Sequence, residues 1–320
     1  MPSSDPGAQT DSGSRTALAQ SGIQNPRSPS RPARLRSVWR GEAASGYRFI
    51  AVPLILLVFI KLYPFAFNFF LSVTEGAFTG GSRFVGLAHF ERILTSATTI
   101  NAFKNTIYMT ALVVPLGTIL SLVAALAVNE RFRLRGVVRL GFVLPMATSV
   151  VVASMVWELI LLPQGGLLNT VLGSGGTNWL QTPNLAMPAV SAVVVWLVVG
   201  LNMLVFLAAL QDVDQELIGS AMVDGASYLQ RMRHVTLPSI KHVTLFVVAT
   251  LTITVFRSFG VIFVLTQGGP VQRTNTLVWE AYLSAFSYLK FNEAAAISVL
   301  MVVVILVLTL IYIRAIRADG

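Results

Sequence analysis

The fold is decided by the stretch from Ala186 to Leu210, which reads AMPAVSAVVVWLVVGLNMLVFLAAL. This stretch contains no Asp, Glu, Lys or Arg. It is longer than the ~20 residues that cross about 30 Å of hydrocarbon at 1.5 Å per residue. Lipid offers the backbone no hydrogen-bond partner, so a chain inside it must bond to itself as a helix. The stretch therefore predicts a transmembrane helix.

Five further apolar segments predict membrane helices for the same reason. Across the whole chain 54% of the residues are hydrophobic and 12% are charged, whereas a soluble domain carries about 25% charged residues. The predicted fold class is all-α, a polytopic membrane protein with about six transmembrane helices. The five segments are approximately residues 47–73, 104–128, 137–162, 242–266 and 292–313.

The remaining sequence divides the chain into a tail and a membrane domain. Residues 1–42 are rich in Ser, Pro, Gly and Arg and lack apolar periodicity, which predicts a disordered cytoplasmic tail. Residues 43–320 form one transmembrane domain. A polar loop at 211–241 separates its fourth and fifth apolar segments.

Lys and Arg gather in the tail and in alternate loops, and this bias sets the orientation because positive charge favours the cytoplasmic side. The loop at 163–185 contains neither residue type. We therefore expect both termini in the cytoplasm, with the tail close to anionic lipid. The prediction rests on Arg27, Arg31, Arg34, Arg36, Arg40, Arg131, Arg133, Arg135, Arg139, Arg231, Arg233, Lys241, Arg314 and Arg317.

The composition also excludes several kinds of chemistry. The chain has no cysteine and three histidines that lie far apart, which excludes disulfides and thiolate catalysis and argues against a metal site. No glycine cluster has the spacing of a phosphate-binding loop. We therefore expect no catalytic residue and no cofactor on this chain. Membrane orientation explains the net charge of +9, so nucleic acid is not an expected partner.

The loop at 211–241 predicts two short helices separated by a break. Asp212 can cap the first helix, and Gly225 can adopt the left-handed conformation that ends it. Ser227 can cap the second helix, with a glutamine in the capping-box position that follows. Pro238 limits continuation into the next membrane helix. The small apolar faces of such helices suit either a protein partner or a lipid surface.

The same loop resembles the cytoplasmic signature of permeases in binding-protein-dependent ABC importers. In that family Glu-Ala-Ala is followed by a Gly and, further along, by Leu-Pro. This chain departs from the pattern at Gly219, where the family places Glu, and at Ser220, so no role of that Glu is carried over. The matching residues are Ala221, Asp224, Gly225, Ala226, Leu237 and Pro238.

Other motifs resemble the carbohydrate-uptake branch of the family, which takes up maltose, trehalose or glycerol phosphate. They extend the resemblance over nearly the whole chain from about residue 47 onward. The matching blocks are Tyr63-Pro64, Phe84-Val85-Gly86-Leu87, Asn105-Thr106, Leu144-Pro145 and Leu265-Thr266-Gln267-Gly268-Gly269-Pro270.

This resemblance implies a type I ABC importer permease fold and a non-catalytic subunit in the bacterial inner membrane. It implies a heterodimer with a second permease subunit, two ATP-binding subunits that hold ATP and Mg, and an extracytoplasmic solute-binding protein. In that family the loop docks into a cleft of the ATPase and transmits its closure to the membrane helices. The residues expected to carry this coupling are Leu217, Ala221, Asp224, Gly225, Ala226, Leu237 and Pro238.

The predicted solute path rests on polar groups inside the apolar segments, which are costly in lipid and tend to face cavities. Planar polar groups together with aromatic faces suit a saccharide. The alternative is an ion pair between Glu158 and Arg257, or hydrogen bonds between helices without ligand contact. Gly260 stands where the family often has Asp, so a contact from that position is lost. The candidate residues are Glu158, Asn202, Arg257, Phe259 and Gln267.

The predicted function is import of a di- or oligosaccharide such as trehalose or maltose, with glycerol-3-phosphate or a glycerophosphodiester as the alternative solute. An intramembrane enzyme would need converging catalytic groups at membrane depth, where Glu158 stands nearly alone among acids. An ion-coupled secondary transporter would need an internal repeat, broken helices and several intramembrane acids. We expect none of these, and therefore expect unbroken membrane helices.

Overall fold

The structure is a computed structural model that describes residues 49–76, 81–130 and 133–318. The predicted tail at 1–42 and the loop residue Arg131 lie outside the described residues. Backbone contacts divide the chain into two units, Met1–Val58 and Phe59–Gly320. The packing described below is that of the second unit.

The described chain is built from helices and one short β-hairpin. In the hairpin β1 pairs antiparallel with β2, with Thr74 opposite Phe84. The elements in chain order, with η marking a π-helical turn, are η1 (Val58–Leu62), α2 (Tyr63–Val73), β1 (Thr74–Glu75), β2 (Arg83–Phe84), α3 (Ala88–Thr95), α4 (Ala97–Asn129), α5 (Arg135–Ala147), α6 (Val150–Ile160), α7 (Leu167–Leu172), α8 (Ala186–Gln211), α9 (Gln215–Val223), α10 (Tyr228–Arg231), η2 (Met232–Thr236), α11 (Leu237–Ser239), α12 (Lys241–Phe256), α13 (Phe259–Leu265), α14 (Leu277–Tyr282), η3 (Leu283–Ser287) and α15 (Phe291–Ala318).

Four helical runs of the described chain are long and apolar enough to cross a membrane. Their mean hydropathy lies between 2.3 and 3.1, which confirms the predicted helices at these positions. The second of them starts at Ala97, ahead of the predicted start at residue 104. The four runs are Phe49–Val73, Ala97–Asn129, Ala186–Gln211 and Phe291–Arg314.

The third predicted segment, residues 137–162, is not one straight helix, so the prediction of unbroken helices is wrong. Its two parts, α5 and α6, meet at an angle of 108°. Pro145 lacks an N–H group and weakens the last turn of α5. Thr148 and Ser149 then take non-helical backbone angles, with ψ values of 142° and 134°.

The fifth predicted segment, residues 242–266, is broken as well. Arg257 and Ser258 separate α12 from α13. The hydroxyl of Ser258 donates to the carbonyl oxygen of Thr254 at 2.7 Å, and such bonds from a side chain to the preceding turn often bend helices. At its other end α12 meets the helical run Tyr228–Ser239 at 68°.

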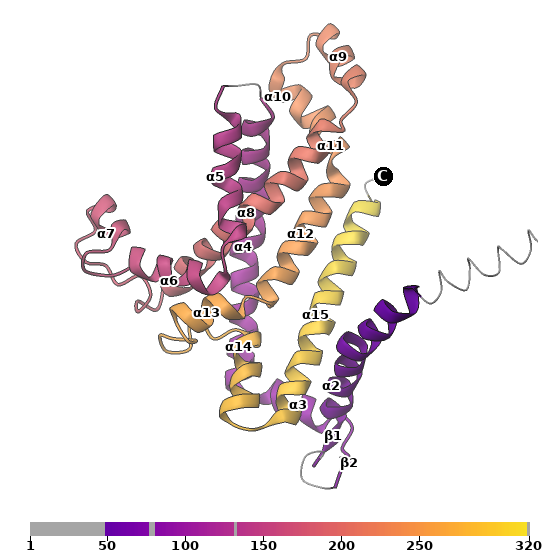
Figure 1. Ribbon diagram of the computed structural model, residues 1–320, viewed down its shortest axis with the longest axis vertical. Helices are drawn as coiled ribbons and strands as arrows, with labels where there is room; N and C mark the ends of the chain where they lie inside the picture. Colours follow the sequence, from indigo (N-terminus) through magenta and orange to yellow (C-terminus); the bar gives the residue numbers. More distant parts are fainter. Residues whose placement is uncertain (1–48, 77–80, 131–132, 319–320) are drawn as a thin grey trace, which may run out of the picture. The chain divides into compact units, whose positions relative to one another are not determined.

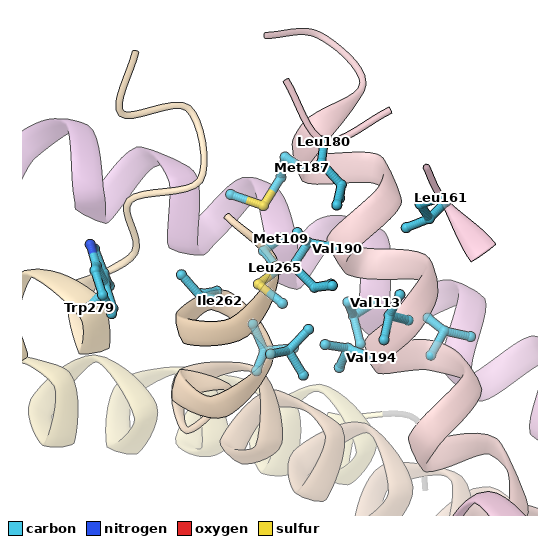
Figure 2. Close-up of a cluster of buried hydrophobic side chains, with 14 of the residues drawn as sticks. Met109, Val113, Leu161, Leu180, Met187, Val190, Val194, Ile262, Leu265 and Trp279 are labelled. Atoms are coloured by element: carbon cyan, nitrogen blue, oxygen red, sulfur yellow. The ribbon is translucent and has the colours of Figure 1, made fainter. Parts of the chain in front are cut away.

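The core of the second unit forms where α4 and α8 pack along their lengths, with α5, α12 and α13 against them. Figure 2 shows Val113 of α4, Val190 of α8 and Ile262 of α13 in one buried cluster. At the contact between α5 and α8, a Cβ on Gly200 would lie 1.9 Å from the carbonyl oxygen of Phe142. Lipid is as apolar as these side chains, so close packing rather than exclusion of water holds the helices together.

The connecting elements lie at two opposite ends of α8 and α12 (Figure 1). One end carries α9 and α10, and the other carries α3, the β-hairpin and α14. At the second end Asn292 of α15 donates to the carbonyl oxygens of Leu71 at 2.9 Å and Thr74 at 2.5 Å. The ring of the buried His89 also contacts the carbonyl oxygen of Thr74, at 3.0 Å. Helices α2, α3 and α15 are therefore tied together by polar contacts.

Candidate functional site

A cavity of about 650 Å³ lies where the two helix breaks meet α8. Residues of α5, α6, α8, α12 and α13 line it, and its volume falls in the ~300–1,000 Å³ range of small-molecule sites. Two of the five residues predicted for the solute path, Asn202 and Arg257, lie together in its wall. Residues at both breaks, among them Thr148 and Arg257, line the cavity together with α8.

Arg257 provides the charge of this cavity. It occupies the C-cap of α12, where its backbone N–H bonds to the carbonyl oxygens of Ile253 and Thr254. Among the described residues that line the cavity, its side chain is the only charged one. No described residue forms an ion pair or hydrogen bond with its guanidinium group. A guanidinium presents five N–H donors in a fixed plane, so these donors remain available to a solute.

A row of hydroxyl groups along α12 and the break that follows it forms another polar wall of the cavity. Thr250, Thr254 and Ser258 recur every fourth residue and all line it. Each hydroxyl donates to a carbonyl oxygen one turn earlier, at 2.7 to 2.9 Å. This leaves the lone pairs of each oxygen able to accept a further bond. The sequence prediction missed this row, although spacing of four on an apolar helix places such residues on one face.

The other three predicted path residues lie elsewhere. Glu158 is exposed on α6, outside the cavity wall, and forms no ion pair with Arg257. Phe259 belongs to an aromatic cluster, 5.8 Å from Trp279 between ring centres. Gln267 lines a separate hollow of about 260 Å³. The predicted alternative, an ion pair between Glu158 and Arg257 within this chain, is therefore wrong.

The first helix of the 211–241 loop begins later than predicted. Asp214, not Asp212, caps α9, and its Oδ1 accepts a hydrogen bond from the backbone N–H of Glu216 at 2.8 Å. Asp212 is instead the C-cap of α8, and its N–H bonds to the carbonyl oxygens of Ala208 and Ala209. The prediction was wrong because α8 continues through Gln211 before the loop starts.

The end of α9 is a complete Schellman motif built by the residues of the sequence signature. Gly225 has a φ of 77°, in the left-handed region. Its N–H bonds to the carbonyl oxygen of Met222 at 3.1 Å, and the N–H of Ala226 bonds to that of Ala221 at 3.0 Å. These are the two bonds that define the motif. They confirm that Gly225 ends the helix and give Ala221 and Ala226 a structural role.

The second helix starts at once and is clamped to this turn. Ser227 and Gln230 form the predicted capping box, with reciprocal bonds of 2.7 and 3.4 Å. The Nη1 atom of Arg231 donates to the carbonyl oxygen of Ala226 at 2.7 Å. The bend between α9 and α10 is therefore fixed by contacts within the loop itself.

Several apolar side chains of the two helices in this loop are not covered by the chain. Val223 is 89% exposed, Leu229 is 74% exposed and Leu217 is 52% exposed. Asp224, Leu237 and Pro238 are also exposed, whereas Ala221 and Ala226 are half-buried. An apolar, internally rigid knob of this kind is typical of a surface that meets a partner.

Together, the apolar helices, the polar cavity between broken helices and the exposed helical knob define a multi-spanning transport subunit of a membrane. The family model described as "binding-protein-dependent transport system inner membrane component" matches residues 117–318. The chain belongs to this family, and it is a permease component of a binding-protein-dependent ABC importer in the inner membrane.

Curated relatives match most of the chain. A trehalose/maltose transport system permease protein, MalF, of Thermococcus litoralis is 35% identical over 85% of this chain and 94% of its own length. An sn-glycerol-3-phosphate transport system permease protein, UgpA, of Agrobacterium fabrum is 32% identical over 82% of this chain and 91% of its own length. These findings confirm the family resemblance predicted from the sequence.

A solved structure shares the fold. A chain of a bacterial ABC transporter involved in the import of the acidic polysaccharide alginate aligns with a TM-score of 0.74 at 24% identity. The alignment covers 88% of this chain and 99% of that chain. It confirms the predicted all-α fold of an ABC importer permease.

Proposed function

We propose that the chain forms half of the translocation path for a sugar, a di- or oligosaccharide such as trehalose or maltose. The observation that carries this proposal is the cavity at the helix breaks. It combines the guanidinium of Arg257, the amide of Asn202 and the hydroxyl row on α12. Each hydroxyl of a sugar can donate and accept, so a wall of mixed donors and acceptors suits it. The relative from Thermococcus litoralis, named for trehalose and maltose, supports the same solute class.

The chain itself is not catalytic in this proposal, and the work of transport comes from partners. Two ATP-binding subunits hold ATP and Mg, a second permease subunit supplies the other half of the path, and an extracytoplasmic binding protein delivers the solute. The exposed apolar side chains of the 211–241 loop support a docking role for Leu217, Ala221, Asp224, Gly225, Ala226, Leu237 and Pro238. Both chain termini then lie in the cytoplasm, on the side of this loop.

The internal bonds of the loop support a mechanical role. Closure of the ATPase has to move the membrane helices between two arrangements. A flexible loop would lose this displacement, whereas capped helices fixed at a clamped bend transmit it. The break between α12 and α13 lies at the cavity wall, so movement of α12 changes the position of Arg257 in the path.

The test is trehalose uptake by proteoliposomes that contain this chain with its second permease, ATPase subunits and binding protein. We expect ATP-dependent uptake, and a fall of at least tenfold when Arg257→Ala removes the cavity's charged donor, which corresponds to about 1.4 kcal/mol. The matched control is Glu158→Gln, because Glu158 is exposed outside the cavity and should be neutral. The proposal is wrong if no disaccharide is imported, or if Arg257→Ala leaves uptake unchanged.

A second solute, sn-glycerol-3-phosphate, is favoured by one observation. Arg257 offers a planar cation of the kind that binds phosphate in a bidentate manner, and the Agrobacterium fabrum relative is named for this compound. The variant Arg257→Gln separates the two solutes. It retains a planar donor for a sugar but abolishes the positive charge, so uptake of a phosphate ester should be lost while sugar uptake is only reduced.

A further inference from the structure

A second hollow, of about 260 Å³, lies at the end of the bundle opposite the 211–241 loop. The start of α4, the loop at 266–276 and α14 with its following turn line it. Gln267, predicted for the solute path, belongs to this hollow and not to the central cavity. The residues relevant here are Thr98, Gln267, Gln272, Trp279, Glu280 and Tyr288.

The loop that walls this hollow holds an unusual backbone shape. Gln267, Val271 and Gln272 all have positive φ values, of 49°, 48° and 57°. Such conformations are unfavourable for residues other than glycine, persist only where the surroundings over-determine them, and cluster at ligand sites. Here Asn101 and Asn105 of α4 both donate to the carbonyl oxygen of Gln272, at 2.9 and 2.7 Å. The wall is therefore preorganised by donors from α4 together with the loop's own Thr274, whose hydroxyl donates to the carbonyl oxygen of Gly269.

The chemistry of the hollow is that of a site for a neutral, hydroxyl-rich molecule. Glu280 is 6% exposed and is the only charged side chain among the described residues that line it. The amide nitrogen of Asn275 donates to Glu280 Oε2 at 2.8 Å, which holds the carboxylate in place. The Glu280 side chain forms no ion pair with a described residue, and its oxygens can accept hydrogen bonds from hydroxyl donors. The amides of Gln267 and Gln272 add both donors and acceptors.

Packed aromatic rings lie between this hollow and the central cavity. Tyr288 is 58% exposed at the rim and offers a ring face to a sugar. Trp279 lies in the hollow wall and stacks on Phe259 at 5.8 Å. The two neighbours of Phe259 in the sequence line the central cavity. A neighbouring hollow of about 230 Å³ shares Thr98, Glu280 and Tyr288 with this one, which gives room beyond one sugar ring. Arg92 and Lys290 also line the neighbouring hollow, and both are paired with Glu293 at 3.3 Å.

We propose that this hollow is an outer saccharide subsite, where an incoming sugar unit is held by Glu280 and Gln267 before it passes the aromatic cluster to the central cavity. The proposal rests on the proposed function, because it names the same solute class. It also discriminates between the two solutes: a neutral disaccharide enters the subsite, and sn-glycerol-3-phosphate is rejected by the buried carboxylate.

The test is equilibrium binding of radiolabelled trehalose, maltose and sn-glycerol-3-phosphate to the full complex in lipid nanodiscs, without the binding protein. The variants are Glu280→Gln, which keeps the shape and removes the charge, and Gln267→Ala, which removes the amide. The matched control is Val271→Ala, since Val271 belongs to the same strained loop, is 84% exposed and does not line the hollow.

We expect the wild-type complex to bind one more disaccharide molecule than either variant binds. Alternatively, the variants bind at the same site, and the wild type reaches half-saturation at a disaccharide concentration at least tenfold lower. Val271→Ala should bind as the wild type, and Arg257→Ala should retain the outer site. The proposal is overturned if both variants bind as the wild type, if sn-glycerol-3-phosphate occupies the Glu280-dependent site, or if neither disaccharide binds. Trehalose uptake measured in parallel separates the two proposals: uptake without Glu280-dependent binding overturns the subsite alone, and no uptake overturns the proposed function.

Discussion

The two loops at the ends of the helical bundle are rigid for different reasons. In the loop at 266–276 the side chains of Thr274, Asn275 and Thr276 are between 0% and 3% exposed, and α4 supplies donors to its backbone carbonyls. The loop at 211–241 receives no such support and holds its shape through a capping box, a Schellman motif and one arginine clamp. The first loop is part of the core, whereas the second is anchored to the core only near its ends, by Val213 and Ile240, and exposes the helices between them.

This difference predicts where a substitution damages folding and where it damages coupling. Contacts of the 266–276 loop reach distant helices, so losing one leaves buried polar groups unpaired, at a cost of about 1–3 kcal/mol each. Contacts of the 211–241 loop are local, and each cap contributes about 1 kcal/mol. We therefore expect substitutions in the first loop to lower stability, and substitutions in the second to lower transport in a complex that still assembles.

The largest effect is expected for Gly268→Ala in the 266–276 loop. A Cβ there would lie 2.6 Å from Nε1 of the buried Trp279, and the φ of 82° is unfavourable for alanine. Left-handed backbone and overpacking together should destabilise the protein by about 2–5 kcal/mol. Thermal unfolding of the purified complex measures the loss. The control Gly219→Ala lies within helix α9 with nothing within 4 Å of its Cβ, and should be neutral or slightly stabilising. If the two variants are equally stable, the 266–276 loop is no more sensitive to substitution than the 211–241 loop, and the contrast between the loops is wrong.

The next effect is expected for Gly225→Val in the 211–241 loop. Nothing lies within 4 Å of a Cβ at this position, so the substitution disturbs only the left-handed turn, at about 1–3 kcal/mol. The complex should assemble, but trehalose uptake should fall at least tenfold while ATP hydrolysis no longer depends on solute. The measurement is the ratio of ATP hydrolysed to trehalose imported.

Gly225→Asn is the matched control for this variant, because asparagine tolerates the left-handed conformation. It should retain most of the coupling. If Gly225→Val transports normally with normally stimulated ATP hydrolysis, the bend does not transmit ATPase closure, and the contrast between the two loops loses its functional meaning.

Much of the fold follows from composition and hydrophobic length, but the breaks do not. Four predicted spans appear as continuous helices, and α4 remains continuous although Pro115 lies inside it. Segments 137–162 and 242–266 are also long and largely apolar, yet they break at Thr148 and at Arg257. The causes are local: a proline in the last turn of α5 and the side-chain bond of Ser258 to the preceding helical turn. Hydropathy averaged over a segment does not detect either.

The candidate site was predictable in the same uneven way. Arg257 and Asn202 were found because polar groups in apolar segments are rare. The row of Thr250, Thr254 and Ser258 was missed because hydroxyls satisfied by their own helix are common in membrane helices. Gln267 was assigned to the same path, but its backbone turns back into a buried loop, and this turn depends on donors from α4 that are distant in sequence.

The smallest effect is expected for Arg231→Ala, which sharpens the comparison by testing the clamp itself. Arg231 is half-buried and links α10 to the residue that follows the Gly225 turn. The loss should be about 1 kcal/mol at most, since one charge-assisted bond is removed at a partly exposed site. Coupling should fall two- to fivefold, measured as ATP hydrolysed per trehalose imported, with unfolding temperature almost unchanged. Arg233→Ala is the matched control, because Arg233 is exposed in the same segment and bonds to no described residue. If both arginine variants couple equally well, the Schellman motif and the capping box are sufficient to fix the bend, and the bond from Arg231 is not needed for coupling.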